Sequence, residues 1–409
     1  MLELTLMSER TSRIAGPGDP MRYRYTVVGA GRQGTASAYD LAKFGDADEV
    51  VLADIDVGKA RTSAARLARL LGRNVARVVR ADVRDPGSVR GAIEGSDVVL
   101  SAVPYFYNYE LTRLAIDAGV SIVDLGGNTS IVRRQLLLDG PARDAGVAVV
   151  PDCGMGPGLN LTLAVHAIER LDEPEDVYIY DGGLPEAPRP PWGYVLTFNV
   201  EGLTNEYSGT ATFLRDGKIV EVPALTELEA IDVPPLGRLE ALVTSGGLST
   251  APWSFAGTLR TLQNKTLRYP GHWSRIVAYR DLGLFDMKPI DVDSCLVVPR
   301  HVFHALFEPL VTPKEIHDVC VERVRAIGTK DGRRAEARVD LVDRYDEATG
   351  FTAMERLTGW HAAIAAGMVA RGVIPPGAHS VERGIPAGPF VNEARRRGLA
   401  IKQMLRYLD

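Results

Sequence analysis

The motif Gly29-Ala30-Gly31-Arg32-Gln33-Gly34 directly follows the apolar run Tyr25 to Val28. A G-x-G-x-x-G motif between a strand and a helix is typical of dinucleotide-binding folds, because its glycines allow a tight turn, close approach of a pyrophosphate and helix packing. Asp54 ends the next apolar run, Val50 to Ala53. A carboxylate there accepts hydrogen bonds from an adenosine ribose and repels a 2′-phosphate. The pattern predicts a bound dinucleotide and favours NAD over NADP.

The first 150 residues alternate between strand-like and helix-like segments. Helical spacing occurs between the apolar runs, and Asp85-Pro86 is a typical helix start. The six strand candidates are Tyr25 to Val28, Val50 to Ala53, Val75 to Val79, Asp97 to Val103, Ser121 to Leu125 and Val147 to Val150. This alternation predicts an α/β fold with a Rossmann-type, doubly wound parallel sheet.

The chain changes character after this alternation, near Pro151. We expect a mobile arm at residues 1–20, the NAD-binding domain at 21–153, an inserted α+β substrate domain with a mixed sheet at 154–345, and C-terminal helices packing back on the first domain at 346–409. The strand candidates of the inserted domain include Val177 to Tyr180, Tyr194 to Val200, Thr212 to Leu214, Lys218 to Val222, Ile276 to Tyr279 and Ala335 to Val342.

Composition narrows the class of protein. The net charge of −5 comes from interspersed acidic and basic residues, so no basic face for nucleic acid is expected. No apolar run is long enough to span a bilayer, and residues 1–20 lack the apolar centre of a signal peptide, which favours a cytoplasmic protein. The three cysteines form no C-x-x-C pair and the histidines form no H-E-x-x-H motif. We therefore expect neither a disulfide framework nor a metal site.

Residues that follow the strands are the first candidates for chemistry, because ligands of doubly wound folds bind outside the carboxyl ends of the strands. Tyr105, Asp124 and Asp152 follow the fourth, fifth and sixth strand candidates and could exchange protons with a substrate. Asp124 and Asp152 could instead cap the next helix, and Cys153 could contact substrate or simply pack. The residues expected to bind the cofactor are Gly29, Gly31, Arg32, Gln33, Gly34, Asp54, Asp82, Val103 and Pro104.

The predicted second domain contains one concentrated polar stretch, Lys265 to His272. We interpret it as a site loop, since Tyr269-Pro270-Gly271 forces a turn that re-aims side chains. Arg268 could hold a carboxylate while His272 or Lys265 titrates. The alternative is a solvated charged face. Upstream, the hydroxyl-rich and glycine-rich segment Thr244 to Thr250 could supply hydrogen-bond donors.

Six segments taken in order resemble the saccharopine dehydrogenase-like family, and within it the lysine 6-dehydrogenases. The resemblance covers nearly all of the chain from Arg24 onward. It is carried by VVGAGRQG (Val27 to Gly34), DLGGN (Asp124 to Asn128), PDCGMGPG (Pro151 to Gly158), EGLTNEY (Glu201 to Tyr207), TSGGLST (Thr244 to Thr250) and KTLRYPGH (Lys265 to His272).

The resemblance implies an NAD-dependent homodimer or homotetramer that oxidatively deaminates the ε-amino group of L-lysine to 2-aminoadipate 6-semialdehyde. Mapped onto this chain, the catalytic candidates are Asp152, His272, Tyr105 and Lys265. The substrate-binding candidates are Asp124, Glu201, Asn205, Thr244, Ser245, Arg268 and Tyr269. A saccharopine or carboxynorspermidine-type reductase is the nearest alternative, and a non-catalytic NAD-binding redox regulator is a more remote one.

Overall fold

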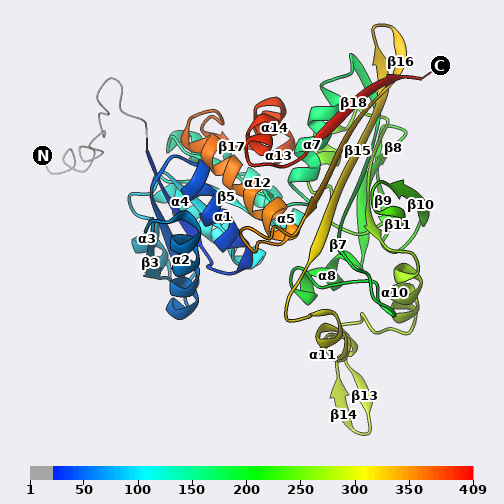
Figure 1. Ribbon diagram of the computed structural model, residues 1–409, viewed down its shortest axis with the longest axis horizontal. Coiled ribbons are helices and arrows are strands. Elements are labelled where there is room, and N and C mark those ends of the chain that lie inside the picture. Colours follow the sequence, from blue (N-terminus) through cyan, green and yellow to red (C-terminus); the bar gives the residue numbers. More distant parts are fainter. Residues whose placement is uncertain (1–21, 409) are drawn as a thin grey trace, which may run out of the picture.

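The computed structural model describes residues 22–408, so the arm expected at residues 1–20 lies outside the described part. Two domains lie side by side along the long axis (Figure 1). The first contains a sheet of seven parallel strands in the order β17-β6-β5-β4-β1-β2-β3. Its strands are β1 (Tyr23–Val28), β2 (Ala47–Asp54), β3 (Ala76–Arg80), β4 (Val98–Ser101), β5 (Ser121–Asp124), β6 (Ala148–Val150) and β17 (Gly377–Ala378).

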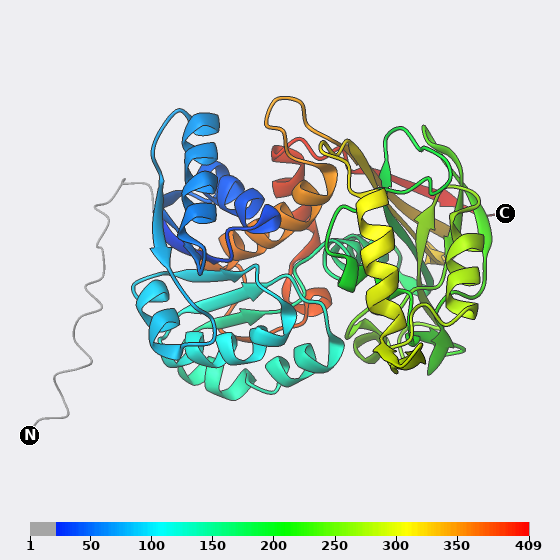
Figure 2. The same ribbon diagram turned by 90° about the horizontal axis from the view of Figure 1, so that it is seen from below.

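Helices cover both faces of this sheet, so its strands are apolar on both sides (Figure 2). The helices are α1 (Arg32–Phe44), α2 (Val57–Leu71), α3 (Pro86–Ile93), α4 (Asn108–Asp117), α5 (Thr129–Leu136), α6 (Asp139–Asp144) and, from the C-terminal segment, α12 (Ala353–Ala370). A short 3-10 helix, η1 (Tyr105–Tyr107), precedes α4. The expected Rossmann-type fold is confirmed, and α12 packs directly on α1.

The second domain is built on a mixed sheet of nine strands, also as expected for the fold class. Its long central strands are β7 (Glu173–Pro185), β12 (Thr261–Arg268), β15 (Asp318–Lys330) and β16 (Arg333–Arg344). The remaining strands are β8 (Thr210–Arg215), β9 (Lys218–Pro223), β10 (Glu229–Val233), β11 (Gly237–Leu242) and β18 (Lys402–Tyr407). Its helices are α7 (Leu159–Ile168), α8 (Val200–Glu206), α9 (Ala251–Phe255), α10 (His272–Asp281) and α11 (Pro299–Val311).

Three segments differ from the secondary structure expected. Residues 194–199 form no strand, and Ile276–Tyr279 belong to α10, because Gly271 in the left-handed conformation (φ +87°) starts a helix right after the Pro270 turn. The C-terminal segment contains the helices α13 (Val381–Gly384) and α14 (Ala387–Arg396), but it ends in β18, which pairs with β16 of the second sheet. The chain end therefore returns to the second domain (Figure 1).

A two-stranded hairpin, β13 (Ile290–Val292) and β14 (Cys295–Val297), projects from the second domain beside α11 (Figure 1). Within residues 22–408, no helix is both long and apolar enough to cross a membrane. The same residues contain no group of three or more histidine, cysteine or acidic side chains arranged to hold a metal ion.

Candidate active site

The glycine loop has the shape that a dinucleotide requires. Gly29 has a φ of +102°, and a Cβ atom there would lie 2.6 Å from the carbonyl oxygen of Ala102. A Cβ on Gly34 would overlap the carbonyl oxygen of Gly29. At Gly31, by contrast, no atom lies within 4 Å of the Cβ position. The open side at Gly31 leaves room for a pyrophosphate at the N-terminus of α1, so these residues fit the expected cofactor.

Asp54 lies where an adenosine ribose is expected. Its Oδ2 accepts a hydrogen bond from the Ala30 backbone N–H at 2.7 Å, and its Oδ1 accepts one from the Asp56 N–H at 2.8 Å. The side chain is only partly buried, so ribose hydroxyls can reach it. A cavity of about 290 Å³ beside Gly31 extends between α1 and α2. Two carboxylates thus lie at the carboxyl end of β2, Asp54 as its last residue and Asp56 two residues beyond it.

The other residues expected to bind cofactor are partly engaged with the protein itself. Arg32 pairs with Glu355 of α12, with 2.7 Å between Nε and Oε1. Asp82 accepts three hydrogen bonds from Arg84, two from the guanidinium and one from the backbone N–H, and these lower the pKa of its carboxyl to about 2. The Gln33 Oε1 atom is buried without a described partner. Val103 packs beside Gly29, and Pro104 precedes η1 in an exposed position.

Asp124 and Asp152 meet at the carboxyl end of the first sheet. The Asp124 Oδ1 accepts hydrogen bonds from the backbone N–H groups of Gly126 and Asp152, and its Oδ2 accepts one from Gln135 Nε2 at 2.7 Å. Since both oxygens bond protein groups, Asp124 acts by positioning the loops after β5 and β6. Tyr105 lies against Gly127, where a Cβ atom would be 3.0 Å from the Tyr105 Cβ.

Asp152 is the most unusual residue at this edge. It has a φ of +63°, a left-handed conformation that costs energy for a side chain other than glycine. Its Oδ2 accepts a hydrogen bond from Ser249 of the second domain, while its Oδ1 is buried without a partner of regular hydrogen-bond geometry in the described chain. The Gly127 backbone N–H lies near the carboxyl and acts to lower its pKa. Burial, together with the nearby Asp124 carboxyl, raises the pKa of Asp152 to about 8. This carboxyl can exchange a proton near neutral pH.

Cys153, the next residue, packs in the main apolar core and is fully buried. Burial raises the pKa of its thiol. Packing is therefore the role its environment supports.

Arg268 ends β12 as a buried guanidinium, with 2 % of its surface exposed. Its Nη2 lies 3.5 Å from the Tyr207 hydroxyl, and its Cζ lies 5.1 Å from the Tyr194 ring centroid. Burial raises the pKa of two neighbouring carboxyls, that of Glu206 to about 7 and that of Asp181 to about 6, against the opposing effect of Arg268. The guanidinium is thus a cation ready to hold a carboxylate.

His272 lies behind Tyr207. Its Nδ1 is 3.1 Å from the Trp192 carbonyl oxygen, and its Nε2 is 3.3 Å from the Tyr207 hydroxyl. Burial and the Arg268 charge lower the pKa of the imidazole to about 3. A neutral imidazole that donates to the Trp192 carbonyl can accept from Tyr207. This placement supports a positioning role, not the proton transfer expected from the sequence.

Lys265 and Tyr269 do not join Arg268, contrary to the expected site loop. Side chains alternate along β12, so Lys265 lies on the opposite face of the sheet from Arg268. There its Nζ bonds the Glu229 carboxylate at 3.0 Å and the Glu227 carbonyl oxygen at 2.9 Å. Tyr269 donates a hydrogen bond to the Pro185 carbonyl and packs in the apolar cluster of that same face. Most of the polar stretch belongs to β12, and the alternation of side chains along this strand places its polar residues on two opposite faces.

Glu201 and Asn205 also face away from Arg268. Asn205 Oδ1 accepts a hydrogen bond from Arg300 of α11, and Glu201 lies 3.6 Å from both Arg300 and His304. Both residues therefore fasten α8 to α11. Glu206, one residue beyond Asn205, is the carboxyl that acts on Arg268. The sequence contained Glu206 within EGLTNEY, but a seven-residue helix gives too little periodicity to show which face is buried.

The loop from Thr244 to Thr250 contacts both Asp152 of the first domain and the residues around Arg268 of the second. Thr244 and Thr266 hydroxyls lie 2.7 Å apart beside Asp181, and Ser245 donates to the Asn205 carbonyl oxygen. Asn160 Nδ2 bonds both the Gly247 carbonyl oxygen and Asp181 Oδ2. Since Ser249 bonds Asp152, this loop connects the strand-end carboxyl to the Arg268 group.

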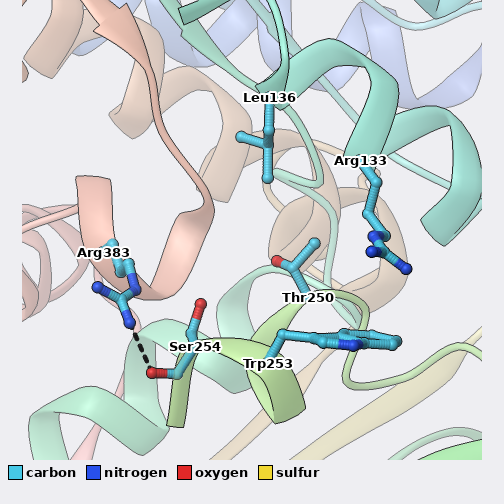
Figure 3. A pocket seen from close by; sticks show the side chains of 6 residues that line it. All are labelled: Arg133, Leu136, Thr250, Trp253, Ser254 and Arg383. Atoms are coloured by element: carbon cyan, nitrogen blue, oxygen red, sulfur yellow. Dashed lines mark hydrogen bonds between the residues drawn. The ribbon is translucent and has the colours of Figure 1, made fainter. Parts of the chain in front are cut away.

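A second cavity, of about 280 Å³, lies where α5 of the first domain meets α9 and α13 (Figure 3). Arg133 lies over the Trp253 ring at 4.8 Å, and Arg383 donates to the Ser254 carbonyl oxygen. Thr250 also lines it and donates to the buried Glu382 carboxylate at 3.0 Å. Cofactor and substrate domains thus leave free space between them at this junction.

Comparison with curated proteins gives partial matches. Mouse (Mus musculus) mitochondrial alpha-aminoadipic semialdehyde synthase is 26% identical over 213 residues, which cover 50% of this chain and 23% of the relative. The NADP(+), L-glutamate-forming saccharopine dehydrogenase of Pyricularia oryzae is 29% identical over 148 residues, covering 34% of this chain and 32% of the relative. The chain therefore matches only about a quarter to a third of the length of these relatives.

Solved structures share the fold over nearly the whole chain. Apo saccharopine dehydrogenase (L-Glu forming) from Saccharomyces cerevisiae superposes with a TM-score of 0.76 at 19% identity, covering 94% of this chain and 100% of the other. The homospermidine synthase of Legionella pneumophila in complex with NAD gives 0.64 at 12% identity, covering 95% and 92%.

Two family models match in succession. The saccharopine dehydrogenase NADP binding domain matches residues 26–150, and the saccharopine dehydrogenase C-terminal domain matches residues 154–399. Together they span nearly the whole described chain, and this protein belongs to the saccharopine dehydrogenase family of oxidoreductases.

Proposed function

We propose that this protein oxidises the ε-amino group of L-lysine with NAD. Lysine, NAD⁺ and water would give 2-aminoadipate 6-semialdehyde, ammonium, NADH and one proton, and the aldehyde would cyclise to a piperideine carboxylate. The observation that carries the proposal is Asp152, a carboxyl with a pKa of about 8 and one unpartnered oxygen, at the sheet edge that also carries the glycine loop. Amine oxidation requires such a group, because only the neutral amine gives up a hydride readily.

NAD bound at Gly29 to Gly34 and Asp54 would supply the hydride acceptor. Above its pKa, Asp152 would take a proton from the ε-ammonium of lysine and release it to solvent. It would then take a proton from the water that attacks the substrate iminium and return it to the ammonia that leaves as ammonium. Ser249 holds Oδ2, which leaves Oδ1 as the atom that receives the proton. The left-handed backbone of Asp152 fixes the direction of this carboxyl.

Arg268 would bind the α-carboxylate of lysine, and Thr244 would add a hydroxyl. Tyr207 and His272 would hold the guanidinium in place through the hydrogen bonds described above. Tyr105, partly exposed against Gly127, would border the reacting end. Assembly into a homodimer or homotetramer remains a prediction.

A saccharopine or carboxynorspermidine-type reductase is the second candidate. It is supported by the likeness to saccharopine dehydrogenases and by the fold shared with homospermidine synthase. The carboxylates Asp54 and Asp56 argue against the NADPH preference expected of such enzymes, since both would repel a 2′-phosphate.

Formation of NADH should be followed with lysine, ornithine, cadaverine and saccharopine, each with NAD and with NADP. We expect the highest kcat/KM with lysine and NAD, and loss of activity in Asp152→Asn. Higher activity with saccharopine than with lysine would favour the second candidate. Binding of NAD without oxidation of any amine would instead indicate a regulator.

A further inference from the structure

Two carboxyl side chains lie directly opposite each other on the face of the second sheet that carries Arg268. Asp181 of β7 pairs with Glu322 of β15 in the antiparallel register, so both side chains point to the same side. Asp181 is 7 % exposed and Glu322 is fully buried. Both oxygens of Glu322 lack a hydrogen-bond partner within residues 22–408. A fully buried carboxyl without a partner is rare in proteins and costly.

The charges around this pair do not balance. Asp181 Oδ2 accepts hydrogen bonds from two neutral amides, Asn160 at 3.2 Å and Asn264 at 3.0 Å. Within residues 22–408, the Arg268 guanidinium acts to lower the pKa of Asp181 and also that of Glu206, against the effect of burial. Burial, and after it the nearby Asp181 carboxyl, raises the pKa of Glu322. Asp181 and Glu206 therefore share one guanidinium, and Glu322 faces no cation among the groups that shift its pKa.

This group lies against the loop that follows β6. Glu206 is only partly buried, and a Cβ on Gly156 would lie 2.6 Å from Asp181 Oδ2. Gly156 belongs to the loop that also carries Asp152. Tyr194, whose ring centroid lies 5.1 Å from Arg268 Cζ, has a buried hydroxyl without a described partner. The missing component that would balance these groups is a positive charge with several N–H donors, such as an ammonium.

We propose that Asp181 and Glu322 bind a second ammonium group of the substrate, distinct from the amine that is oxidised. The substrates are then diamines and diamino acids, and amines without a second ammonium group are disfavoured. The proposal rests on the proposed function only in taking this face as part of the amine-binding site.

Calorimetry on the enzyme loaded with NADH tests the subsite without turnover. The probes are lysine, cadaverine, which keeps both nitrogens but lacks the carboxylate, and 6-aminohexanoate, which keeps the carboxylate but lacks the α-ammonium. We expect 6-aminohexanoate to bind about 10- to 100-fold more weakly than lysine. Lysine and cadaverine should also release protons on binding, so the measured heat should depend on the ionisation enthalpy of the buffer.

The variants Glu322→Gln and Asp181→Asn should weaken the binding of lysine and cadaverine by about 10- to 100-fold and leave the binding of 6-aminohexanoate unchanged. Asp232→Asn, which removes a charge from an exposed position on β10, is the matched control and should change none of the three. Glu322→Gln should also raise the melting temperature, so weaker binding would not reflect unfolding. If the variants weaken the binding of all three probes equally, or of none of them, the proposed subsite is wrong.

The outcomes separate this subsite from lysine oxidation. If cadaverine binds with proton release but no lysine is oxidised, the proposed function fails and the subsite stands. If lysine is oxidised but 6-aminohexanoate binds as tightly as lysine, the subsite fails and the proposed function stands.

Discussion

The two sheets present functional groups in different ways. In the first sheet, Asp54 and Asp124 are the last residues of parallel strands, Asp152 comes two residues after another, and all three lie at the carboxyl end of the sheet. In the second sheet, Asp181, Arg268 and Glu322 project from one face, within or at the end of long strands. At a strand end, consecutive residues can serve the same site. On a strand face, neighbours in sequence serve opposite sides, as Lys265 and Thr266 do.

The electrostatics of the two regions differ as well. Backbone N–H groups hold Asp54 and Asp124 at the sheet edge. On the second sheet, Asp181 bonds neutral amides and Glu322 bonds nothing in the described chain. Of the three carboxyls at the carboxyl end of the first sheet, only Asp152 has an oxygen without a partner in the described chain, whereas on the face of the second sheet both oxygens of Glu322 lack one. Substrate specificity should therefore depend mainly on the residues on the face of the second sheet, and catalysis on those at the carboxyl end of the first sheet.

Asp152→Asn should have the largest effect. Without a titrating carboxyl at the edge, kcat should fall by about 100- to 10,000-fold. The wild-type kcat/KM should rise with pH through an apparent pKa near 8, because Asp152 accepts a proton only when ionised, and the variant should lack this inflection. Initial rates from pH 6 to 10 measure it; Asp144→Asn, on the exposed end of α6, is the control. A variant with wild-type rates would remove Asp152 from the mechanism.

The two variants Arg268→Met and Lys265→Met test whether the two faces of β12 have different roles. Removing Arg268 should lower kcat/KM for lysine by about 100-fold or more, since a buried charged partner of the carboxylate is lost. Removing Lys265, three residues away, should change kcat/KM by less than about threefold, because it contacts Glu229 on the other face. Steady-state kinetics decide, and equal losses in both variants would contradict the assignment of faces.

Asp54→Ser tests the cofactor preference at the sheet edge. Loss of the carboxylate should reduce the ratio of kcat/KM with NAD to that with NADP by about 10- to 100-fold, because the repulsion of a 2′-phosphate disappears. Lysine affinity should stay unchanged. If the wild-type protein already uses NADP as well as NAD, Asp54 does not set the preference.

The smallest effect should be on stability. Asp152, Glu206 and Asp181 have raised pKa values of about 8, 7 and 6 in the folded protein. Their stabilising contribution is complete below the pKa of the unfolded chain, near 4, and is lost as pH rises through 6 to 8. The melting temperature should therefore fall between pH 5 and pH 9. Glu322→Gln should raise stability by about 1–3 kcal/mol at pH 8; a lower melting temperature would argue against an unpartnered carboxyl.

The contrast between edge and face also explains what the sequence allowed us to predict. Six parallel strands and the glycine loop were predictable, because turn glycines and apolar runs are local signals. Asp152 and Arg268 were identified as candidates. Lys265 and Glu201 were placed in the wrong surroundings, since side-chain direction depends on register and on packing partners along the chain. Asp181 and Glu322 were missed because a single acid within an apolar strand gives no local pattern.

The last strand was missed for a related reason. β18 has the sequence KQMLRY, without an alternating apolar pattern, because it lies at the edge of its sheet with both faces largely open. Only its pairing with β16 defines it as a strand, and this pairing joins residues more than sixty positions apart.

That strand has a mechanical consequence. The chain crosses between the domains after β6, again before α12, and a third time between α14 and β18. With three chain connections, a domain movement that opens the junction is restricted to rotation about an axis close to all of them. Substrate entry would then require a hinge rotation of one domain against the other in a fixed direction. Cutting the chain between α14 and β18 would allow a less restricted rotation without removing any residue of the site.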